Sequence, residues 1–324
     1  MVTTTCLVYR PGSGIANDVP LAQALAAIGE PGAIVWIDVL DPDEASFAPI
    51  AASLALHPLT VEDVLNPDGR PKVEDLGNHV LVIFKALNFN PGEQLLDAIN
   101  LNAIVHVETL VTVRAKPVRS VQTIRDELAR RPAGMERGPA FLLYRILDNV
   151  LELYQPLFEE IEVAIEELEE RIFGRGGEDP TTEIYERKAQ VTHLRRRTGP
   201  QRELLMVLSH RPHLTIAPDL QVYFRDLHDQ ATRMHDHLES YRDLLQGALD
   251  THMSRMSNQM SQVMKVLSLV ATILLPLTLL TGLYGTNFYF LPGAGHHAGF
   301  WVFSGALAAI GLSTVLYFKV KRWF

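Results

Sequence analysis

The sequence predicts an α+β protein whose N-terminal α/β domain continues through a long helix into two C-terminal membrane-spanning helices. Three observations predict this fold class. No Asp, Glu, Lys or Arg occurs from Val266 to Phe318. Every acidic residue lies at or before Asp250. Apolar residues at helical spacing connect the two regions without an obvious break. At about 150 residues per domain, a chain of 324 residues also suggests two units.

Charge is distributed unevenly along the chain. The formal charge is −9, of which +5 belongs to the residues after Asp250, so the first 250 residues carry −14. An acidic front and a basic, apolar tail indicate two different environments. Cys6 is the only cysteine, which rules out an intrachain disulfide. The opening stretch, MVTTTCLVYRPGSG, lacks the basic and apolar regions of a signal peptide, so none is expected.

The first 135 residues are predicted to form the α/β domain. Apolar runs and period-2 alternation predict strands at 33–39 and 79–87 and a hairpin-like pair at 98–113, while helical spacing predicts helices at 21–29 and 44–56. The mixture of strands and helices over one continuous stretch favours a sheet covered by helices.

An antiparallel helical pair is predicted for residues 136–217. Its helices are expected at 141–173 and 181–209, separated by the breaker GRGGEDP at 174–180. The first helix has a dense acidic run from Glu159 to Glu170, and the second contains Arg195–Arg197. One interpretation is a solvated acidic face paired with these arginines. The other is an acidic face that attracts cations.

A third helix is predicted to begin at Pro218 and to continue to Tyr284, so that residues 218–265 form a stalk. Its apolar residues alternate in steps of three and four, as in a heptad seam. They are Phe224, Leu227, Ala231, Met234, Leu238, Tyr241, Leu245 and Ala248. A helix over 219–284 measures about 100 Å, whereas the hydrocarbon core of a bilayer takes about 30 Å. The remainder is therefore expected to project into the cytoplasm.

Two stretches have the length and composition of membrane spans. They are 266–284 and 300–318, each 19 residues long, with a Gly-rich loop at 285–299 between them and a basic tail at 319–324. Lys265 precedes the first span, and three further cations follow the second. The positive-inside rule then places both termini in the cytoplasm. The alternative is a buried helical hairpin in a soluble protein.

One face of the first span is small and polar. Steps of three and four residues from Asp250 reach Ser254, Ser257, Ser261, Met264, Leu267 or Ser268, Ala271, Leu275, Thr278, Gly282 and Gly285. This set is called the stripe below. It predicts either a surface for close helix packing or a water-lined path with apolar constrictions. Because two helices cannot enclose a pore, the second interpretation requires an oligomer with the first span inward.

Four motifs make the chain resemble the CorA family of metal-ion transporters over nearly its whole length. They are YGTNF at 284–288, VMKVLSLVATILLPLTLLTGLYG at 263–285, HPLTVEDVLNPDGRPKVED at 57–75 and YFRDLHD at 223–229. YGTNF is similar to the family's Tyr-Gly-Met-Asn-Phe signature, with Thr286 in place of Met. The motifs occur in the family's order and are followed by a basic C-terminus.

The resemblance implies a funnel-shaped homopentamer in the bacterial or archaeal plasma (inner) membrane. At the pore mouth, a ring of Asn287 would hold a hydrated divalent cation, with Gly285 and Thr286 beside it. An uncharged amide suits Mg²⁺, which gives up its water reluctantly. Further along the pore, the resemblance assigns these positions: Gly282, polar Thr278 and Ser261, small Ala271, an apolar gate of Met264, Leu267 and Leu275, and Asp250 at the cytoplasmic mouth.

The resemblance also implies a regulatory metal site between subunits. Asp226 matches the family's acidic residue near the start of the stalk, and Asp75 or Glu74 of the neighbouring subunit would complete the site. Cytoplasmic Mg²⁺ would neutralise the facing carboxylates and favour a closed pore, whereas loss of Mg²⁺ would let the subunits repel each other. Mg²⁺ is thus expected both as substrate and as regulatory ligand, and no organic cofactor is expected.

The expected activity is passive uptake of Mg²⁺, with Co²⁺ and Ni²⁺ as further substrates. A zinc transporter like the ZntB branch is the alternative, and a membrane-anchored coiled-coil scaffold is the alternative from another class. Enzyme activity and ATP-driven pumping are not expected, because neither a P-loop nor a hydrolase motif occurs. The expected partners are further copies of the chain, membrane lipid and divalent cations, with no nucleic acid.

Six histidines are candidate zinc ligands. They are His228, His235, His237, His252, His296 and His297. His235 and His237 are two residues apart and therefore point to different sides of a helix. Exposed stalk positions are the favoured interpretation for the stalk histidines, and His296 and His297 in the outer loop are the better candidates for contact with a transition metal.

Overall fold

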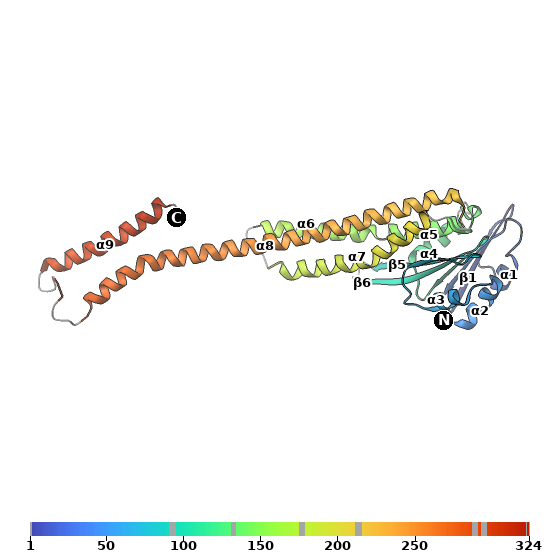
Figure 1. The fold of residues 1–324 in the computed structure, drawn as a ribbon, viewed down its shortest axis with the longest axis horizontal. Coiled ribbons are helices and arrows are strands. Elements are labelled where there is room, and N and C mark those ends of the chain that lie inside the picture. The colour runs from blue at the N-terminus through green and yellow to red at the C-terminus, as the bar shows by residue number, and fades with distance from the viewer. Residues whose placement is uncertain are drawn as a thin grey trace. The chain divides into compact units, whose positions relative to one another are not determined.

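The computed structural model describes residues 2–90, 95–130, 134–174, 179–210, 216–286, 291–292, 297–321 and 323. The chain divides into two compact units, Met1–Ala248 and Leu249–Phe324. They are called the N-terminal and C-terminal units. The division lies inside the stretch 218–265 predicted as a stalk, and one helix passes through it (Figure 1).

The N-terminal unit is built on a seven-stranded sheet with the order β2-β1-β3-β7-β6-β5-β4. Its strands are β1 (Thr3–Arg10), β2 (Gly14–Ala16), β3 (Ile34–Leu40), β4 (Lys72–Asp75), β5 (Val80–Asn90), β6 (Leu95–Val105) and β7 (Thr109–Arg114). Only the pairing of β3 with β7 is parallel. The predicted strands at 33–39 and 79–87 and the hairpin at 98–113 are confirmed, whereas β1, β2 and β4 were not predicted.

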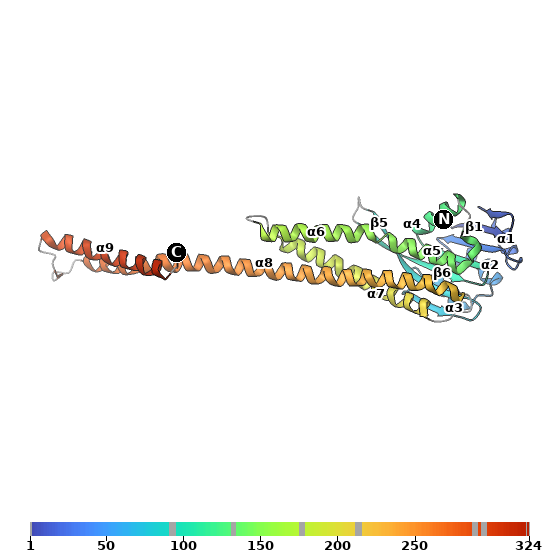
Figure 2. The ribbon, with the colours of Figure 1, turned by 90° about the horizontal axis from the view of Figure 1, so that it is seen from above.

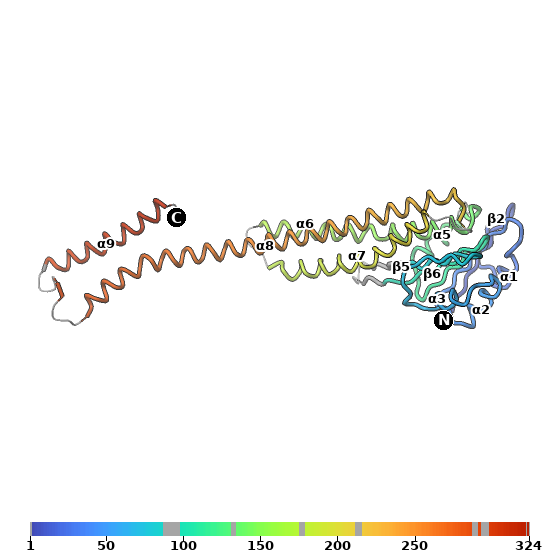
Figure 3. The backbone as a smooth tube through the Cα atoms, in the orientation of Figure 1, coloured from blue at the N-terminus to red at the C-terminus, as the bar shows by residue number. Residues whose placement is uncertain are grey.

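Helices cover both faces of this sheet. On one face, alternate residues such as Val35, Ile37 and Val39 pack into a core with α1 (Leu21–Ala26), α2 (Glu44–Ser53) and α3 (Pro58–Leu65). On the other face lie α5 (Pro139–Glu152) and α7 (Thr181–His210) (Figure 3), and α4 (Arg119–Arg130) packs against α5. The helix predicted at 44–56 ends at Ser53, and α3 follows as a separate helix.

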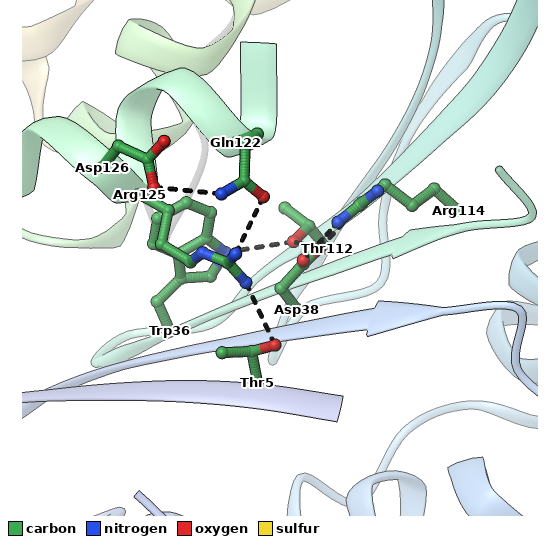
Figure 4. A network of polar contacts seen from close by, with 8 residues as sticks. All are labelled: Thr5, Trp36, Asp38, Thr112, Arg114, Gln122, Arg125 and Asp126. Atoms are coloured by element: carbon green, nitrogen blue, oxygen red, sulfur yellow. Dashed lines mark hydrogen bonds and ion pairs between the residues drawn. The ribbon is translucent and has the colours of Figure 1, made fainter. Parts of the chain in front are cut away.

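The second face of the sheet contains a buried polar network (Figure 4). Arg114 binds both carboxylate oxygens of Asp38, at 3.2 Å from Nε to Oδ1 and 2.7 Å from Nη2 to Oδ2. Thr112 donates to Asp38 Oδ1 at 2.7 Å, and Trp36 Nε1 donates to Thr112 at 3.0 Å. These bonds satisfy an ion pair that is almost fully buried between β3 and β7.

The predicted helix at 141–173 is wrong in one respect, because it is two helices, α5 and α6 (Gln155–Phe173). Pro156 occupies the first turn of α6 and has no N–H to continue α5. Tyr154 at the break is buried, and its hydroxyl donates to Lys85 O of β5 at 3.3 Å. The break is therefore held by contact with the sheet, and the apolar periodicity does not reveal it. The partner helix predicted at 181–209 is confirmed as α7.

The sequence predicted that the acidic run pairs with Arg195–Arg197, and this is wrong for Arg195, which pairs with α8 (Gln221–Tyr284) instead. Arg195 Nε lies 3.0 Å from Glu239 Oε1 of α8. The acidic run instead meets Arg187, whose Nη1 lies 3.7 Å from Glu160 Oε1. Both pairs are partly exposed, so their contribution to stability is small.

The long third helix is confirmed as α8, which follows a 3₁₀ turn at Pro218–Leu220. Seven of its eight predicted seam residues are buried within the N-terminal unit: Phe224, Leu227, Ala231, Leu238, Tyr241, Leu245 and Ala248. Met234 is half-buried. In the C-terminal unit, α9 (His297–Val320) is somewhat longer than the predicted span at 300–318 and runs antiparallel to the end of α8 (Figures 1 and 2). Both helices are long and apolar enough to cross a membrane.

Candidate functional site

The end of α8 has one side that contacts α9. The ring centres of Tyr284 and Phe303 are 4.4 Å apart, and a Cβ at Gly311 of α9 would lie 3.8 Å from Leu277 Cδ1. Leu269 is 5% exposed. At the other end of the hairpin, Lys265 Nζ lies 5.7 Å from the ring centre of Trp323. These contacts orient α8 about its own axis relative to α9.

Within the apolar span, the stripe residues from Met264 to Gly282 other than Ser268 lie about 120–180° around α8 from Leu269, at about 100° per residue, and they are exposed beside α9. Its predicted pore residues are all exposed in the single chain: Asp250, Ser261, Met264, Leu267, Ala271, Leu275, Thr278 and Gly282. Flanking residues such as Leu274 and Leu279 are exposed as well. The stripe is therefore distinguished from its flanks by small and polar side chains, and exposure alone does not single it out.

Thr278 shows what a hydroxyl on this side can do. Its Oγ1 donates to Leu274 O at 2.8 Å, so its proton is committed to the helix backbone. The oxygen lone pairs remain as acceptors. A hydroxyl in this state can accept hydrogen bonds from water molecules around a cation, and a ring of such oxygens would favour a hydrated cation over an anion.

α8 ends at Tyr284, and the N–H of the following Gly285 donates to Thr281 O at 2.8 Å. A Cβ atom at Gly285 would lie 3.1 Å from the same Thr281 oxygen, closer than side chains normally approach. Thr286 follows, and its hydroxyl donates to Leu283 O at 2.7 Å. Asn287, the predicted ion-binding residue, lies outside the described residues, as does His296.

Asp226 is part of a small polar cluster that joins α8 to α5. Gln230 Nε2 donates to Asp226 Oδ2 at 2.9 Å and to Asp148 Oδ1 at 3.1 Å. Burial, followed by the nearby charges of Asp148 and Asp226, raises the pKa of Tyr144 to about 12. The sequence analysis missed Asp148. The feature that could have identified it is the position of an acidic residue within the apolar helix FLLYRILDNVLE.

The two other predicted regulatory acids lie on β4, at the edge of the sheet. Glu74 Oε1 accepts a bond from Lys72 Nζ at 3.0 Å, and Lys72 also binds Asp63 at 2.6 Å. Partial burial acts to lower the pKa of Lys72, but the bonds to Asp63 and Glu74 outweigh it and raise the pKa. Glu74 thus forms an ion pair with a lysine of its own chain. Asp75 is exposed, which makes it the better candidate ligand for a metal shared with a second copy.

No group of three or more His, Cys, Asp or Glu side chains could hold a metal ion within the parts of one chain that the structure describes. Asp226 therefore has too few carboxylate neighbours there for a complete site. Further ligands would have to come from water or from another subunit.

Comparisons with known proteins agree with this arrangement. The family model described as CorA-like Mg²⁺ transporter protein matches residues 31–322. The cobalt/magnesium transport protein CorA of Thermotoga maritima is 31% identical over 269 residues, covering 83% of this chain and 77% of that protein. The zinc transport protein ZntB of Photorhabdus laumondii is 25% identical over 257 residues, covering 78% and 77%. The complete structure of the CorA magnesium transporter from Methanocaldococcus jannaschii matches with a TM-score of 0.82 and 22% identity, covering 100% of both chains.

Proposed function

Because the chain belongs to the CorA-like Mg²⁺ transporter family, we propose that it is a channel that admits Mg²⁺ into the cytoplasm down its electrochemical gradient. Family membership makes the protein a membrane transporter of divalent cations rather than an enzyme. The proposal goes beyond family membership in naming Mg²⁺ as the principal ion. The observation that supports a channel is the stripe on α8, which faces away from α9.

The proposed assembly is a homopentamer in the plasma membrane, with both termini in the cytoplasm. Each copy contributes the stripe side of α8 to a shared axis and turns α9 toward lipid. The contacts of Tyr284 and Leu277 with α9 favour this orientation, because the stripe residues of the apolar span lie on another side of α8. The absence of any acid from the membrane segment agrees with a pore that does not trap the ion.

Within this pore the ion keeps most of its water. A ring of Asn287 at the outer mouth and rings of Thr278 and Ser261 further in accept hydrogen bonds from that water. Met264, Leu267 and Leu275 form apolar rings that close the path when the pore narrows enough to lose its water. Asp250 attracts the cation at the cytoplasmic mouth.

Control by cytoplasmic Mg²⁺ is assigned to Asp226 with Asp75, or less favourably Glu74, of a neighbouring subunit. The carboxylates supply the oxygen ligands that Mg²⁺ prefers, and water supplies the rest. Binding would hold neighbouring copies together and favour the closed pore. Loss of Mg²⁺ would leave facing carboxylates that repel each other.

Zinc transport is the second candidate, and the ZntB relative favours it. Mg²⁺ remains the main proposal because a cobalt/magnesium transporter is 31% identical to the chain. The two candidates differ in how much water the ion must keep, since Zn²⁺ accepts nitrogen ligands readily and Mg²⁺ does not.

Flux into liposomes that contain the purified protein tests the proposal. Wild type is expected to conduct Mg²⁺, and Asn287→Ala is expected to conduct it poorly. Thr278→Val has a matched control in Thr314→Val, since both hydroxyls donate to the carbonyl four residues earlier at 2.8 Å. Only the Thr278 variant should reduce flux. Equal flux from wild type and Asn287→Ala would refute the amide ring, and Zn²⁺ flux without Mg²⁺ flux would favour the second candidate.

A further inference from the structure

Two histidines from different helices face each other where α7 ends and α8 begins. The ring centres of His210, the last residue of α7, and His228, in the second turn of α8, are 6.1 Å apart. Their planes are inclined by 89°. Both residues lie in the N-terminal unit. The sequence predicts an exposed stalk position for His228, which is half-buried, and does not indicate His210 as its neighbour.

In each ring, the Nδ1 atom is next to an acceptor. His210 Nδ1 lies 3.1 Å from Met206 O and 2.7 Å from Ser209 Oγ. Because Ser209 donates its own proton to Met206 O at 3.0 Å, its oxygen is available to accept from Nδ1. His228 Nδ1 lies 3.6 Å from Asp229 Oδ1. Nδ1 of His210 is within hydrogen-bond distance of Met206 O, whereas Asp229 is a nearby negative charge that lies beyond hydrogen-bond distance of His228.

Both Nε2 atoms are available as ligands. Among the residues that the structure describes, no hydrogen bond or ion pair engages Nε2 of His210 or of His228. A histidine that donates Nδ1–H to a carbonyl while offering Nε2 is the usual arrangement of a metal ligand, and His210 beside Met206 O has this arrangement. His228 is a second imidazole beside it, so two ring nitrogens are available to a shared ion.

The spacing of the rings fits one ion between them. A zinc–nitrogen bond of about 2.1 Å, plus about 1.1 Å from the nitrogen to the ring centre, places each ring centre roughly 3.2 Å from the metal. Two rings around one ion are then at most about 6.4 Å apart, by the same estimate. The observed 6.1 Å is just inside this limit. At a tetrahedral angle the same lengths place the ring centres about 5.2 Å apart, so a side-chain rotation must bring the rings about 0.9 Å closer.

We propose that His210 and His228 form a binding site for a transition-metal dication such as Zn²⁺, Ni²⁺ or Co²⁺, which joins the end of α7 to α8. Imidazole nitrogen suits these ions, whereas Mg²⁺ prefers oxygen. Water completes the coordination, since only two protein ligands are present. An ion held in this way exchanges readily, as a reversible signal requires.

The site has a consequence that rests on the proposed function. His228 lies two residues after Asp226 on the same helix. An ion that ties His228 to α7 restrains the segment of α8 in which Mg²⁺ control was placed. The channel would then respond to transition metals at His210 and His228 and to Mg²⁺ at Asp226, through ligands of different chemistry.

Binding of Co²⁺ to the full-length protein in detergent, followed by its visible absorption in excess Mg²⁺, tests the site directly. Wild type is expected to show an absorption component that His210→Ala and His228→Ala both lose. His193→Ala is the matched control, because His193 is an exposed histidine of α7 that should leave the component unchanged. Retention of the full signal in both variants would overturn the proposal, as would its complete displacement by Mg²⁺.

Flux measured on the same proteins separates the site from the proposed function. Loss of the Co²⁺ signal in the two variants, with no Mg²⁺ flux even from wild type, would support the site and overturn the channel. Mg²⁺ flux from all four proteins, with an unchanged Co²⁺ signal, would support the channel and overturn the site.

Discussion

Tyr284 and Phe303 join the two membrane helices beside the outer loop, with ring centres 4.4 Å apart and planes inclined by 33°. The hydroxyl of Tyr284 also donates to Pro292 O at 3.2 Å. One side chain thus contacts α9 with its ring and the far side of the loop with its hydroxyl. In the sequence, Asn287 lies between Tyr284 and Pro292.

Two substitutions of Tyr284 should distinguish the contribution of its ring from that of its hydroxyl. Tyr284→Phe keeps the ring but loses the bond to Pro292, a change of about 0.5–1.5 kcal/mol. Tyr284→Ala loses both. We expect Mg²⁺ flux in liposomes to fall slightly for the first variant and strongly for the second. Tyr317→Phe, in the exposed part of α9, is the control. Wild-type flux from Tyr284→Ala would show that this side chain does not position the loop.

A side chain at Gly285 should disturb the pore mouth. In Gly285→Ala, the new Cβ would lie 3.1 Å from Thr281 O, so the end of α8 must shift. We expect reduced flux from a protein that still assembles, as judged by size-exclusion chromatography in detergent. Gly305→Ala is the matched control, because its Cβ would meet nothing within 4 Å. Similar flux from the two variants would contradict this role for Gly285.

Removal of the Asp226 carboxylate should abolish the response to cytoplasmic Mg²⁺. In wild type, we expect added Mg²⁺ to slow proteolysis of the N-terminal unit, because bound metal holds neighbouring copies together. Asp226→Ala should lose this protection, while Asp236→Ala, an exposed acid of the same helix, should keep it. Asp148→Ala tests whether the residue linked to Asp226 through Gln230 contributes as well. Full protection in Asp226→Ala would argue against the control site.

Breaking the buried pair of Asp38 and Arg114 should destabilise the N-terminal unit. Their side chains are 2% and 6% exposed. Arg114→Met leaves a buried carboxylate without its partner, which costs about 3–5 kcal/mol. Asp38→Leu combined with Arg114→Met should recover much of this loss. Urea unfolding followed by circular dichroism measures the stability of the single and the double variant. Arg10→Met, at the exposed pair with Glu30, is the control. An equal loss of stability in Arg10→Met and Arg114→Met would contradict a special cost for the buried pair.

His79 should make stability depend on pH. It is fully buried, and its Nδ1 and Nε2 lie 2.7 Å from Asn78 Oδ1 and 2.9 Å from Thr60 Oγ1. Asn78 Nδ2 donates to Ala55 O at 3.1 Å, which turns Asn78 Oδ1 toward the ring as an acceptor. Burial, followed by His106 and His57, lowers the pKa of His79 below its ordinary value of 6.5.

The sign follows from proton binding by the unfolded chain. Below pH 6.5 the unfolded chain takes up a proton at His79 more readily than the folded protein does. Stability is therefore full above 6.5 and falls as the pH drops toward the lowered value. The midpoint of urea unfolding should decrease on acidification, and less so in His79→Gln. His237→Gln, at an exposed position, should retain the wild-type slope.

The sequence by itself determined the features that depend on neighbouring residues along the chain. The steps of three and four in α8, the uncharged stretch from Val266 to Phe318 and the alternation in β6 and β7 are all local periodicities. They record which side of an element avoids water, so they predicted the long helix, the two apolar helices and the hairpin. The four motifs extended this to the family.

Only the tertiary structure decided which distant residues meet. It bonded Tyr154, between α5 and α6, to the sheet, brought Asp148 to Asp226 through Gln230, and placed His210 against His228. Each of these pairs joins residues on different elements, and no spacing along the chain encodes that proximity. Burial against the sheet and packing between helices fix such contacts, because the core of the N-terminal unit admits only one arrangement that excludes water and satisfies the polar groups.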